Sequence, residues 1–522
     1  MNIALLQPET RSLLQRVWRL ALPVLLTNLL QSFVSVVDVY MVGRLGPIAI
    51  AAIGMSTAIQ FLVLVMVLSV SAGAMSLIAQ AKGARDSARM SFVTRQAITS
   101  GVMLALVLTA IGYFSAEPLL TLINSGGDPE AVILGTQYLQ IVFLGTIFLI
   151  LNMVINRLMQ GAGDTVTPLY LTAGLNVLNI AFNYVLMFGL GPIPALGVPG
   201  AAIGTVLARF LGAVLGFVII YSGRNVVKVL PGGTYQPDWR LITDIFSIGV
   251  PSGIQGIFRN GSRLLVIGIL TSTEVGTYGA AALAIGFQVE SLAFMPVLGI
   301  NVAATSLVGQ ALGSWQTLEA RLRGNMAIYL GIGVMIILAS PIVIFAPLII
   351  RLFDPSAHPV VAQAGVAYLR INTVSLPFTA IAMVANGALR GAGDSFPGMV
   401  STLLNKAAIT VGLAYLFAFP LGMGSTGVWI GLVIGTVFDA LYMALRWRGK
   451  GWHRVALHKT EIYRQHLKHL PEQVQEQFLQ EVRTPLMAEP TAQEKVLEGE
   501  VVYVLERREV RIKFERMRYQ IS

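Results

Sequence analysis

The stretch WRLALPVLLTNLLQSFVSVVDVYMV, from Trp18 to Val42, decides the fold class of this chain. It is long and apolar enough to cross a bilayer as a helix, which takes about 20 residues at 1.5 Å each. Within it lies a carboxylate, Asp38, one turn before the run Gly43-Arg44-Leu45-Gly46. A charged side chain at the centre of a membrane helix costs about 2.5 to 3.5 kcal/mol. Such a residue normally faces a protein interior or a wet cavity, so we interpret Asp38 as functional.

Asp38 belongs to a polar stripe with Asn28, Gln31 and Ser35. Their spacings of three, four and three place all four on one face of a helix. We assign the stripe to a substrate cavity or gate, and the alternative is structural hydrogen bonding between packed helices. Pro23 precedes the stripe and removes one helical hydrogen bond, which predicts a bend there.

The composition confines the chain to the membrane class. Of 522 residues, 55% are hydrophobic and only 12% are charged, and the mean hydropathy is +0.72. A soluble core with this composition would be exceptional. The chain has no cysteine, which excludes disulfides, thiol catalysis and cysteine-ligated metal sites.

Apolar runs of about 20 residues predict twelve membrane helices before Arg446. Their centres lie near residues 30, 63, 105, 143, 178, 210, 257, 292, 334, 376, 408 and 436. Basic residues gather in alternate connections, including Lys82, Arg157 and Arg390, whereas the opposite connections contain Arg44 and Arg351. This positive-inside pattern predicts that both termini are cytoplasmic. It also accounts for most of the net charge of +10 without a nucleic-acid partner.

The chain repeats itself with an offset of 230 residues. The run Gly161-Ala162-Gly163-Asp164 recurs as Gly391-Ala392-Gly393-Asp394, Gln80-Ala81 recurs as Gln310-Ala311, and Tyr138-Leu139 recurs as Tyr368-Leu369. We therefore predict two six-helix lobes, an N-lobe over 1–221 and a C-lobe over 241–446, joined by a linker over 222–240. Six is an even number, so the lobes should be related by a pseudo-two-fold axis along the membrane normal. The glycine-rich loops at 161–163 and 391–393 are either hinges or tight turns.

Residues 447–522 are polar and predict a soluble cytoplasmic tail. A helix is expected over 461–482 and two short strands over 501–521. Four histidines lie in the tail, His453, His458, His466 and His469. His466 and His469 are one turn apart, but we predict no metal site because no third ligand accompanies them.

Taken together, the twelve helices, the duplication, the segment from Gln31 through Asp38 to Gly46 and the paired Gly-Ala-Gly-Asp loops resemble the multidrug and toxic compound extrusion (MATE) family. The resemblance covers residues 10–446. It implies cation-coupled efflux by two lobes that rock between inward-open and outward-open states. The wider superfamily also contains flippases of lipid-linked sugars.

The resemblance places a cation site in the N-lobe. Asp38 matches the first-helix aspartate of the family. Asn179 and Asn183 match its fifth-helix ligands, and with Asn176 they share one helical face because they are spaced three and four apart. Ala201 and Thr205 resemble the sixth-helix carbonyl and hydroxyl donors. This set of oxygens suits H⁺ or transient Na⁺, and the alternative is a structural asparagine ladder.

The C-lobe departs from the family pattern. Arg259 stands where many NorM-like relatives carry a glutamate, and Thr379 stands where they carry an aspartate. This arrangement, with Pro23, is closer to the DinF-like branch. Gln255, Arg259 and Arg263 instead form a basic stripe in the substrate cavity or gate. We expect Glu290 to pair with the arginines and Lys406 with Asp439, because a buried charge needs a partner. Alternatively, the arginines contact an anionic group of the substrate.

These features predict a secondary antiporter that exports small organic compounds, cationic or amphipathic, in exchange for H⁺ or Na⁺. No cofactor, no nucleic acid and a monomer in the plasma membrane are expected, with the bilayer and the substrate as partners. A lipid-linked saccharide flippase is the alternative. A membrane enzyme or ATP-driven pump is not supported, because the membrane part has no phosphate-binding Walker loop and only His358 as a histidine.

Overall fold

The computed structural model describes residues 8–124, 126–353, 358–449, 451–452, 493–497, 500–505 and 508–513. The chain forms two compact units, Met1–Ala456 and Leu457–Ser522. The second contains an antiparallel sheet in the order β1-β2-β3, formed by Gln493–Leu497, Glu500–Leu505 and Arg508–Lys513. β2 and β3 overlap the stretch predicted as two strands, whereas β1 was not predicted. The helix predicted over 461–482 and the four tail histidines lie outside the described residues.

The first unit is built of helices. Their bounds are α1 Pro8–Gly43, α2 Pro47–Gly83, α3 Ser87–Ile123, α4 Pro129–Leu144, α5 Thr146–Gly161, α6 Val166–Phe188, α7 Gly197–Tyr221, α8 Trp239–Thr271, α9 Gly276–Gly313, α10 Thr317–Ile344, α11 Ala346–Phe353, α12 Pro359–Asn372, η2 Thr373–Ser375, α13 Leu376–Gly391, α14 Phe396–Ser401, η3 Thr402–Thr410, α15 Val411–Ala418 and α16 Gly424–Arg448. η2 is a 3₁₀ turn and η3 is a π-helical segment.

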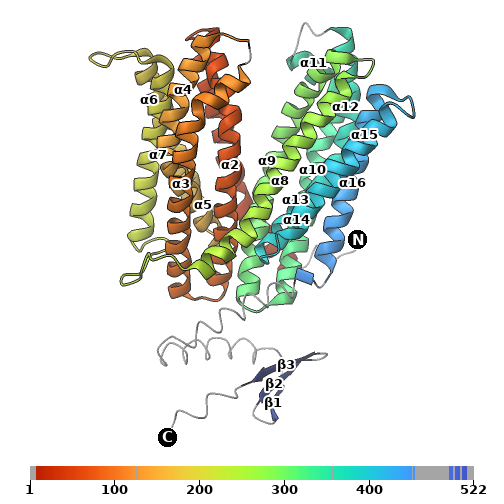
Figure 1. Cartoon of the computed structure of the whole chain (residues 1–522). Coiled ribbons are helices and arrows are strands. Elements are labelled where there is room, and N and C mark those ends of the chain that lie inside the picture. Colours follow the sequence, from red (N-terminus) through yellow and green to blue (C-terminus); the bar gives the residue numbers. More distant parts are fainter. Residues whose placement is uncertain are drawn as a thin grey trace. The chain divides into compact units, whose positions relative to one another are not determined.

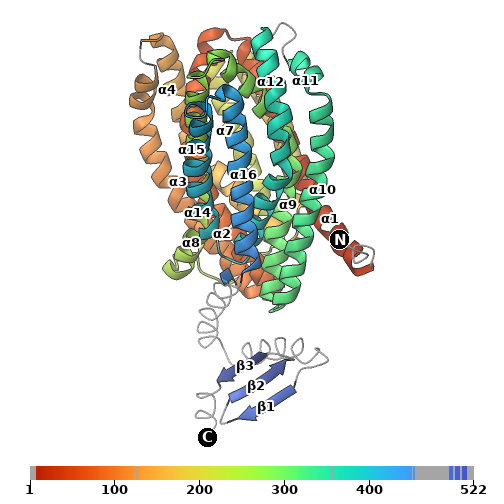
Figure 2. The ribbon, with the colours of Figure 1, turned by 90° about the vertical axis from the view of Figure 1, so that its right-hand side faces the viewer.

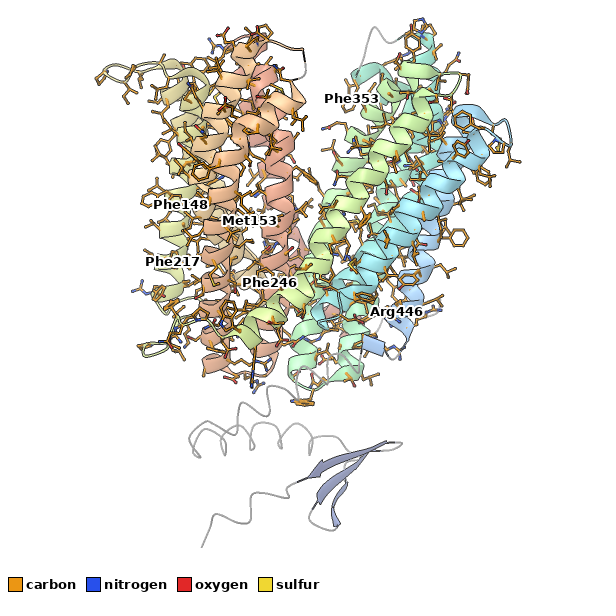
Figure 3. The ribbon with its side chains drawn as sticks, viewed as in Figure 1. Phe148, Met153, Phe217, Phe246, Phe353 and Arg446 are labelled. Carbon is orange, nitrogen blue, oxygen red and sulfur yellow. The ribbon has the colours of Figure 1, made fainter. Side chains whose placement is uncertain are left out.

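Eleven helical spans within the described residues are long and apolar enough to cross a membrane. The total is twelve when α4 and α5, which meet at an angle of 50°, are taken as one span. This agrees with the predicted all-α membrane fold. Large apolar side chains such as Phe114 and Leu352 are exposed on the outer helix faces, and Figure 3 shows side chains projecting from both bundles. Such surfaces are stable in lipid rather than in water.

Short-range signals set several helix boundaries. Asp86, Asp128 and Asp238 each precede a helix and accept a hydrogen bond from a backbone N–H of its first turn. These aspartates satisfy donors that have no partner within the helix. Pro129 then occupies the first turn of α4, where the missing N–H of proline costs nothing.

The helices form two bundles, α2–α7 from the first half of the chain and α8–α16 from the second. Figure 1 shows that the bundles approach each other at one end and diverge toward the end that carries α11 and the start of α4. Figure 2 shows the second bundle face-on. The linker runs along the first bundle, where the backbone N–H of Leu230 donates to Ser91 Oγ over 2.8 Å and Gln96 Nε2 donates to the Gln236 carbonyl over 2.8 Å.

α1 packs on both bundles. Val17 and Ala21, in its first part, belong to the apolar core of the second half together with residues of α9, α10 and α13. Met41 and Val42, at its other end, pack with first-half residues of α2, α6 and α7. The buried Pro23 lies between the two contact regions. α1 therefore connects the bundles mechanically, with a proline between its two attachments.

Candidate functional site

Asp38 meets a buried asparagine of α6. Asn183 Nδ2 donates a hydrogen bond to Asp38 Oδ1 over 3.0 Å. The side chain of Asp38 is partly buried, and Asn183 is only 2% exposed. An amide that donates to a buried carboxylate offsets part of the cost of removing that charge from water.

The contacts continue from α6 to α7 as a chain of polar groups. Asn183 Nδ2 also lies 3.4 Å from Asn179 Oδ1, and Asn179 Nδ2 donates to Thr205 Oγ1 over 3.3 Å. Asn183 Oδ1 is buried and has no hydrogen-bond partner among the described residues. Buried polar atoms are normally satisfied, so an acceptor without a donor beside a carboxylate is suited to a cation.

The other predicted N-lobe residues are arranged less closely. Ala201 is buried in the apolar cluster that contains Met41 and Val42. Ser35 and Gln31 are exposed, and Ser35 Oγ donates to the Gln31 carbonyl within α1. Asn28 and Asn176 are partly buried. Of the α1 stripe, Asp38 is the member whose side chain bonds to α6 in the described part of the chain.

Arg209 is a charged neighbour of this site that the sequence analysis missed. It lies on α7, four residues after Thr205, and its guanidinium interacts electrostatically with Asp38 and Tyr138. Its Nη1 is buried and has no hydrogen-bond partner among the described residues. The signal was available, because an arginine inside an apolar run can be recognised by the same test as Asp38.

The bundles are joined at their close end by a clasp, which consists of Ser76 and Gln80 of α2, Ser306 and Gln310 of α9, and the carbonyls of residues 161, 390 and 391. Ser76 Oγ donates to the residue 390 carbonyl over 2.7 Å, and Gln80 Nε2 donates to the residue 391 carbonyl over 3.1 Å. In the mirrored arrangement, Ser306 Oγ and Gln310 Nε2 donate to the residue 161 carbonyl over 2.9 and 3.2 Å. Each clasp side chain has its counterpart 230 residues away, so the contact is two-fold symmetric.

The clasp also requires close backbone approach. A Cβ at Gly83 would collide with the Gln310 carbonyl, and a Cβ at Gly313 would collide with the Gln80 carbonyl. The glycine-rich loops themselves are tight turns, because Gly163 and Gly393 have φ values of +89° and +84°. The loops contribute to the clasp through the carbonyls of residues 161, 390 and 391, which come just before these turns and accept the hydrogen bonds.

In the second half, Glu290 is 7% exposed and accepts hydrogen bonds from Tyr368 Oη, over 2.6 Å, and from Asn372 Nδ2. The predicted ion pair between Glu290 and Arg259 or Arg263 is wrong, because within the described structure every N–O distance between these side chains is longer than 4.0 Å. Neutral donors on α12 occupy the carboxylate instead.

The cations of the second half have other neighbours. The Cζ atom of Arg263 lies 3.7 Å from the centre of the Phe287 ring, a cation–π contact. Lys406 Nζ donates to Thr436 Oγ1 over 2.8 Å, and Asp439 accepts a hydrogen bond from Ser401. The predicted direct pair between Lys406 and Asp439 is therefore also wrong.

Gln255 and Thr379, two further polar residues of the second half discussed in the sequence analysis, both form hydrogen bonds within it. Asn386 Nδ2 donates to Gln255 Oε1 over 2.8 Å, which joins α13 to α8. Thr379 Oγ1 donates to the Ser375 carbonyl one turn earlier. Gln255 is therefore held by the bundle, while Arg259 and Arg263 on the same stripe are exposed.

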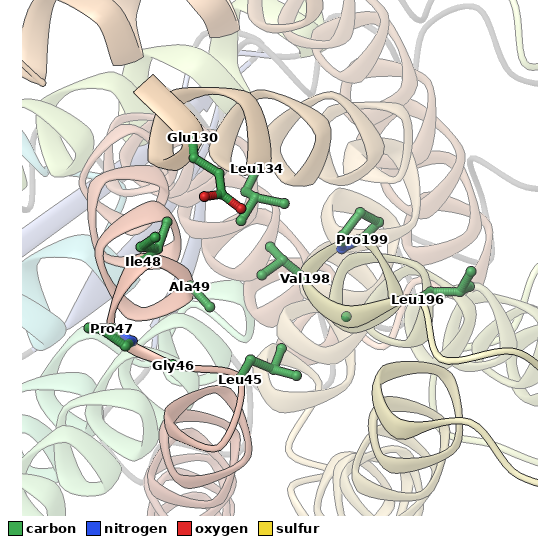
Figure 4. Close-up of a pocket in the computed structure, with 11 residues that line it drawn as sticks. Leu45, Gly46, Pro47, Ile48, Ala49, Glu130, Leu134, Leu196, Val198 and Pro199 are labelled. Carbon is green, nitrogen blue, oxygen red and sulfur yellow. The ribbon is translucent and has the colours of Figure 1, made fainter. Parts of the chain in front are cut away.

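A pocket with a volume of about 280 Å³ lies near the end of the first bundle at which α1 ends and α2 begins. Figure 4 shows Pro47, Leu134, Val198 and Pro199 around it, with Glu130 as the charged side chain of its lining. Neither Asp38 nor the asparagines of α6 line it, so we do not assign the pocket to the coupling site.

Comparison with known proteins identifies the family. The MatE family model matches residues 23–185 and 251–416, one stretch in each half. A probable multidrug resistance protein NorM from Rhizobium meliloti is 31% identical over 82% of this chain and 91% of its own length. A second, from Thermotoga maritima, is 28% identical over 86% of this chain and 95% of its own length. The chain belongs to the MATE family.

The solved structures agree with this assignment at the level of the fold. An outward-facing multidrug resistance MATE transporter superposes with a TM-score of 0.77 and 24% identity, covering 85% of this chain and 96% of the other. The predicted fold is thus confirmed, and the family match confirms the predicted transport function. The protein is a multi-pass MATE efflux transporter that exchanges drugs for ions, not an enzyme. Family membership favours drug efflux over the flippase alternative.

Proposed function

We propose that this MATE transporter couples efflux to a cation that binds at Asp38, Asn179, Asn183 and Thr205. The unpartnered Asn183 Oδ1 beside the Asp38 carboxylate carries this proposal. Carboxylate, amide and hydroxyl oxygens are hard ligands that suit Na⁺, and the carboxylate alone suits H⁺. The carbonyl of Ala201 completes the proposed ligand set.

α1 supports a route from this site to the second bundle. Its Asp38 end packs on the first bundle and its Val17 end packs on the second, with Pro23 between them. Neutralising Asp38 removes the charge that Asn183 bonds, so α1 can repack against α6 and bend at Pro23. A coupling ion drives such a change only if it binds the two states with different affinities.

The clasp supports an outward-open state. It joins the ends of α2 and α9. Lys82 and Arg85 lie at and just after the end of α2, and Arg321 and Arg323 lie in the first two turns of α10, directly after the turn that follows α9. By the positive-inside rule we infer that this end, and both termini, are cytoplasmic. The bundles diverge at the opposite end (Figure 1), from which substrate would leave.

We further infer that small organic compounds, cationic or amphipathic, are the exported substrates, and that the transporter acts as a monomer in the plasma membrane. The second lobe has Arg259 and Thr379 at the positions discussed above, which supports a DinF-like pattern with coupling confined to the first lobe. The stripe residues Asn28, Gln31 and Ser35 are proposed to line the substrate path, since Gln31 and Ser35 are exposed.

The test is efflux from proteoliposomes under separately imposed Na⁺ and pH gradients. Asp38→Asn should leave the protein folded and inserted but abolish gradient-driven efflux. Glu117→Gln, which removes an exposed carboxylate from α3, is the matched control and should transport normally. Gradient-dependent efflux by well-inserted Asp38→Asn protein would contradict the coupling role.

A further inference from the structure

The second half contains a cluster of charges within the membrane part. We define the C-lobe charge cluster as Arg259 and Arg263 of α8, Glu290 of α9, Lys406 of η3 and Asp439 of α16. With every group ionised, three cations face two carboxylates, which leaves one positive charge in excess. Charges in such surroundings are normally balanced by a partner.

The members of the cluster influence one another without forming ion pairs. Arg259 interacts electrostatically with Asp439, and Glu290 interacts with Lys406 and Arg263. Within the described structure, no N–O contact within 4.0 Å joins these groups. The two arginines therefore keep hydrogen-bonding capacity that the carboxylates do not use.

The carboxylates are already engaged by neutral donors. Glu290 accepts from Tyr368 and Asn372, and Asp439 accepts from Ser401. A carboxylate held by neutral donors cannot turn toward a guanidinium without giving up those bonds. The cluster therefore combines carboxylates held by neutral donors with two exposed arginines.

Both arginines are exposed, and their electrostatic neighbours belong to their own bundle. Arg259 interacts electrostatically with Asp439 of α16 and with Lys406 of η3. Arg263 interacts electrostatically with Glu290 of α9 and Tyr368 of α12. Both guanidinium groups are therefore accessible to a ligand while they lie near fixed charges of their own bundle.

The two halves differ in the charge of the group that bonds a corresponding threonine. The runs Ile203-Gly204-Thr205-Val206 and Ile434-Gly435-Thr436-Val437 correspond to each other. In the first half the threonine accepts from the neutral amide of Asn179, whereas in the second it accepts from the ammonium of Lys406. The second lobe thus contains a built-in cation beside the counterpart of the proposed coupling site.

We propose that the C-lobe charge cluster binds an anionic group, the carboxylate of an amphipathic substrate, through Arg259 and Arg263. A planar guanidinium offers two parallel donors that match a carboxylate, and the Arg263–Phe287 stack holds one guanidinium in place. This subsite goes beyond the proposed coupling role of Asp38 and does not depend on it. It would admit zwitterionic substrates whose cationic part binds elsewhere in the transporter.

The experiment uses two dyes that differ in one group. Tetramethylrhodamine carries a free carboxylate, and its methyl ester does not. Fluorescence polarisation with the full-length protein in phosphatidylcholine nanodiscs should show about tenfold tighter binding of the carboxylate dye, as a charge-assisted contact provides. Equal affinities would overturn the proposal.

Variants test whether the preference for the carboxylate dye over its ester depends on the two arginines. Arg259→Gln/Arg263→Gln should reduce it to less than about twofold, whereas Arg351→Gln, which removes an exposed arginine from α11, should preserve it. A preference that survives in the double variant would overturn the assignment. If the double variant does not fold, competition on the unmodified protein decides, because benzoate should displace the carboxylate dye and not the ester. Benzoate that displaces both dyes equally, or neither, would overturn it.

Two further measurements test whether the dye preference arises instead from the first lobe or from an anionic lipid. Asp38→Asn should retain the dye preference even if it abolishes efflux, and its loss would transfer anion recognition to the first lobe. Nanodiscs that contain phosphatidylglycerol should retain the preference as well. Abolition by this anionic lipid would assign the arginines to a lipid phosphate and overturn the substrate assignment.

Discussion

The clasp between the two bundles should control the balance between outward-open and inward-open states. The perturbation is Gln80→Leu or Gln310→Leu, each of which removes one hydrogen bond between bundles, of 3.1 or 3.2 Å, and preserves side-chain volume. A neutral hydrogen bond contributes about 0.5 to 1.5 kcal/mol. Each variant should therefore shift the equilibrium roughly fivefold toward the inward-open state, and the double variant roughly thirtyfold if the effects add.

The chain has no cysteine, so spin labels can be placed without first removing any. Glu130→Cys and Leu352→Cys put labels near the start of α4 and on α11, at the end where the bundles diverge (Figure 1). Pulsed electron paramagnetic resonance should then show a larger population at short distance in both glutamine variants. Gln363→Leu, at an exposed position of α12, is the control and should leave the distances unchanged.

The symmetry of the clasp gives a sharper test. Gln80 and Gln310 occupy equivalent positions and bond to equivalent carbonyls, so their single variants should shift the distance distribution to a similar extent. Unchanged distributions in the double variant would refute the reasoning, because the clasp would then not contribute to the free-energy difference between states. A large effect from one glutamine alone would restrict the gate to one half of the clasp.

The remaining predictions concern the cation at Asp38. One carboxylate balances one H⁺ or one Na⁺, so Na⁺ affinity measured by calorimetry should rise by up to about tenfold per pH unit wherever Asp38 is protonated, and Asn183→Asp should weaken this dependence by adding a second charge. Affinity that is constant with pH, or unchanged in Asp38→Asn, would place Na⁺ elsewhere. Arg209→Gln should strengthen cation binding by about tenfold, since a nearby positive charge opposes it by roughly 1–2 kcal/mol at an effective dielectric constant of about 20. An unaltered affinity would show that Arg209 does not influence the site.

The fold was largely predictable because hydropathy reports directly on membrane spans. The twelve predicted centres all fall within the helical spans of the structure. The bend between α4 and α5 was not predicted, since Gly145 sits inside a continuous apolar run. The π-helical geometry of η3 was also beyond the sequence argument, because it depends on how Thr410 and Asn405 bond in the packed bundle.

The site was predictable where helical spacing fixes a shared face. Asn179 and Asn183 lie four apart, and the structure joins them in one hydrogen-bonded chain to Asp38. The C-lobe ion pairs were not predictable, because a sequence shows which charges lie in the membrane but not which neutral donors reach them first. Tyr368, which donates to Glu290, lies 78 residues later in the chain, on α12.

The duplication permits one further step about how the two lobes divide their work. Thr205 and Thr436 are equivalent, yet Asn179 donates to the first and Lys406 to the second. A fixed ammonium repels a second cation in low-dielectric surroundings. In the N-lobe the Asp38 carboxylate offsets the charge of Arg209, whereas the C-lobe charge cluster keeps one positive charge in excess, so we infer that the coupling ion is directed to the N-lobe. On this proposal, two duplicated frameworks that differ in the charge beside an equivalent threonine would let the N-lobe attract cations and the C-lobe attract anions.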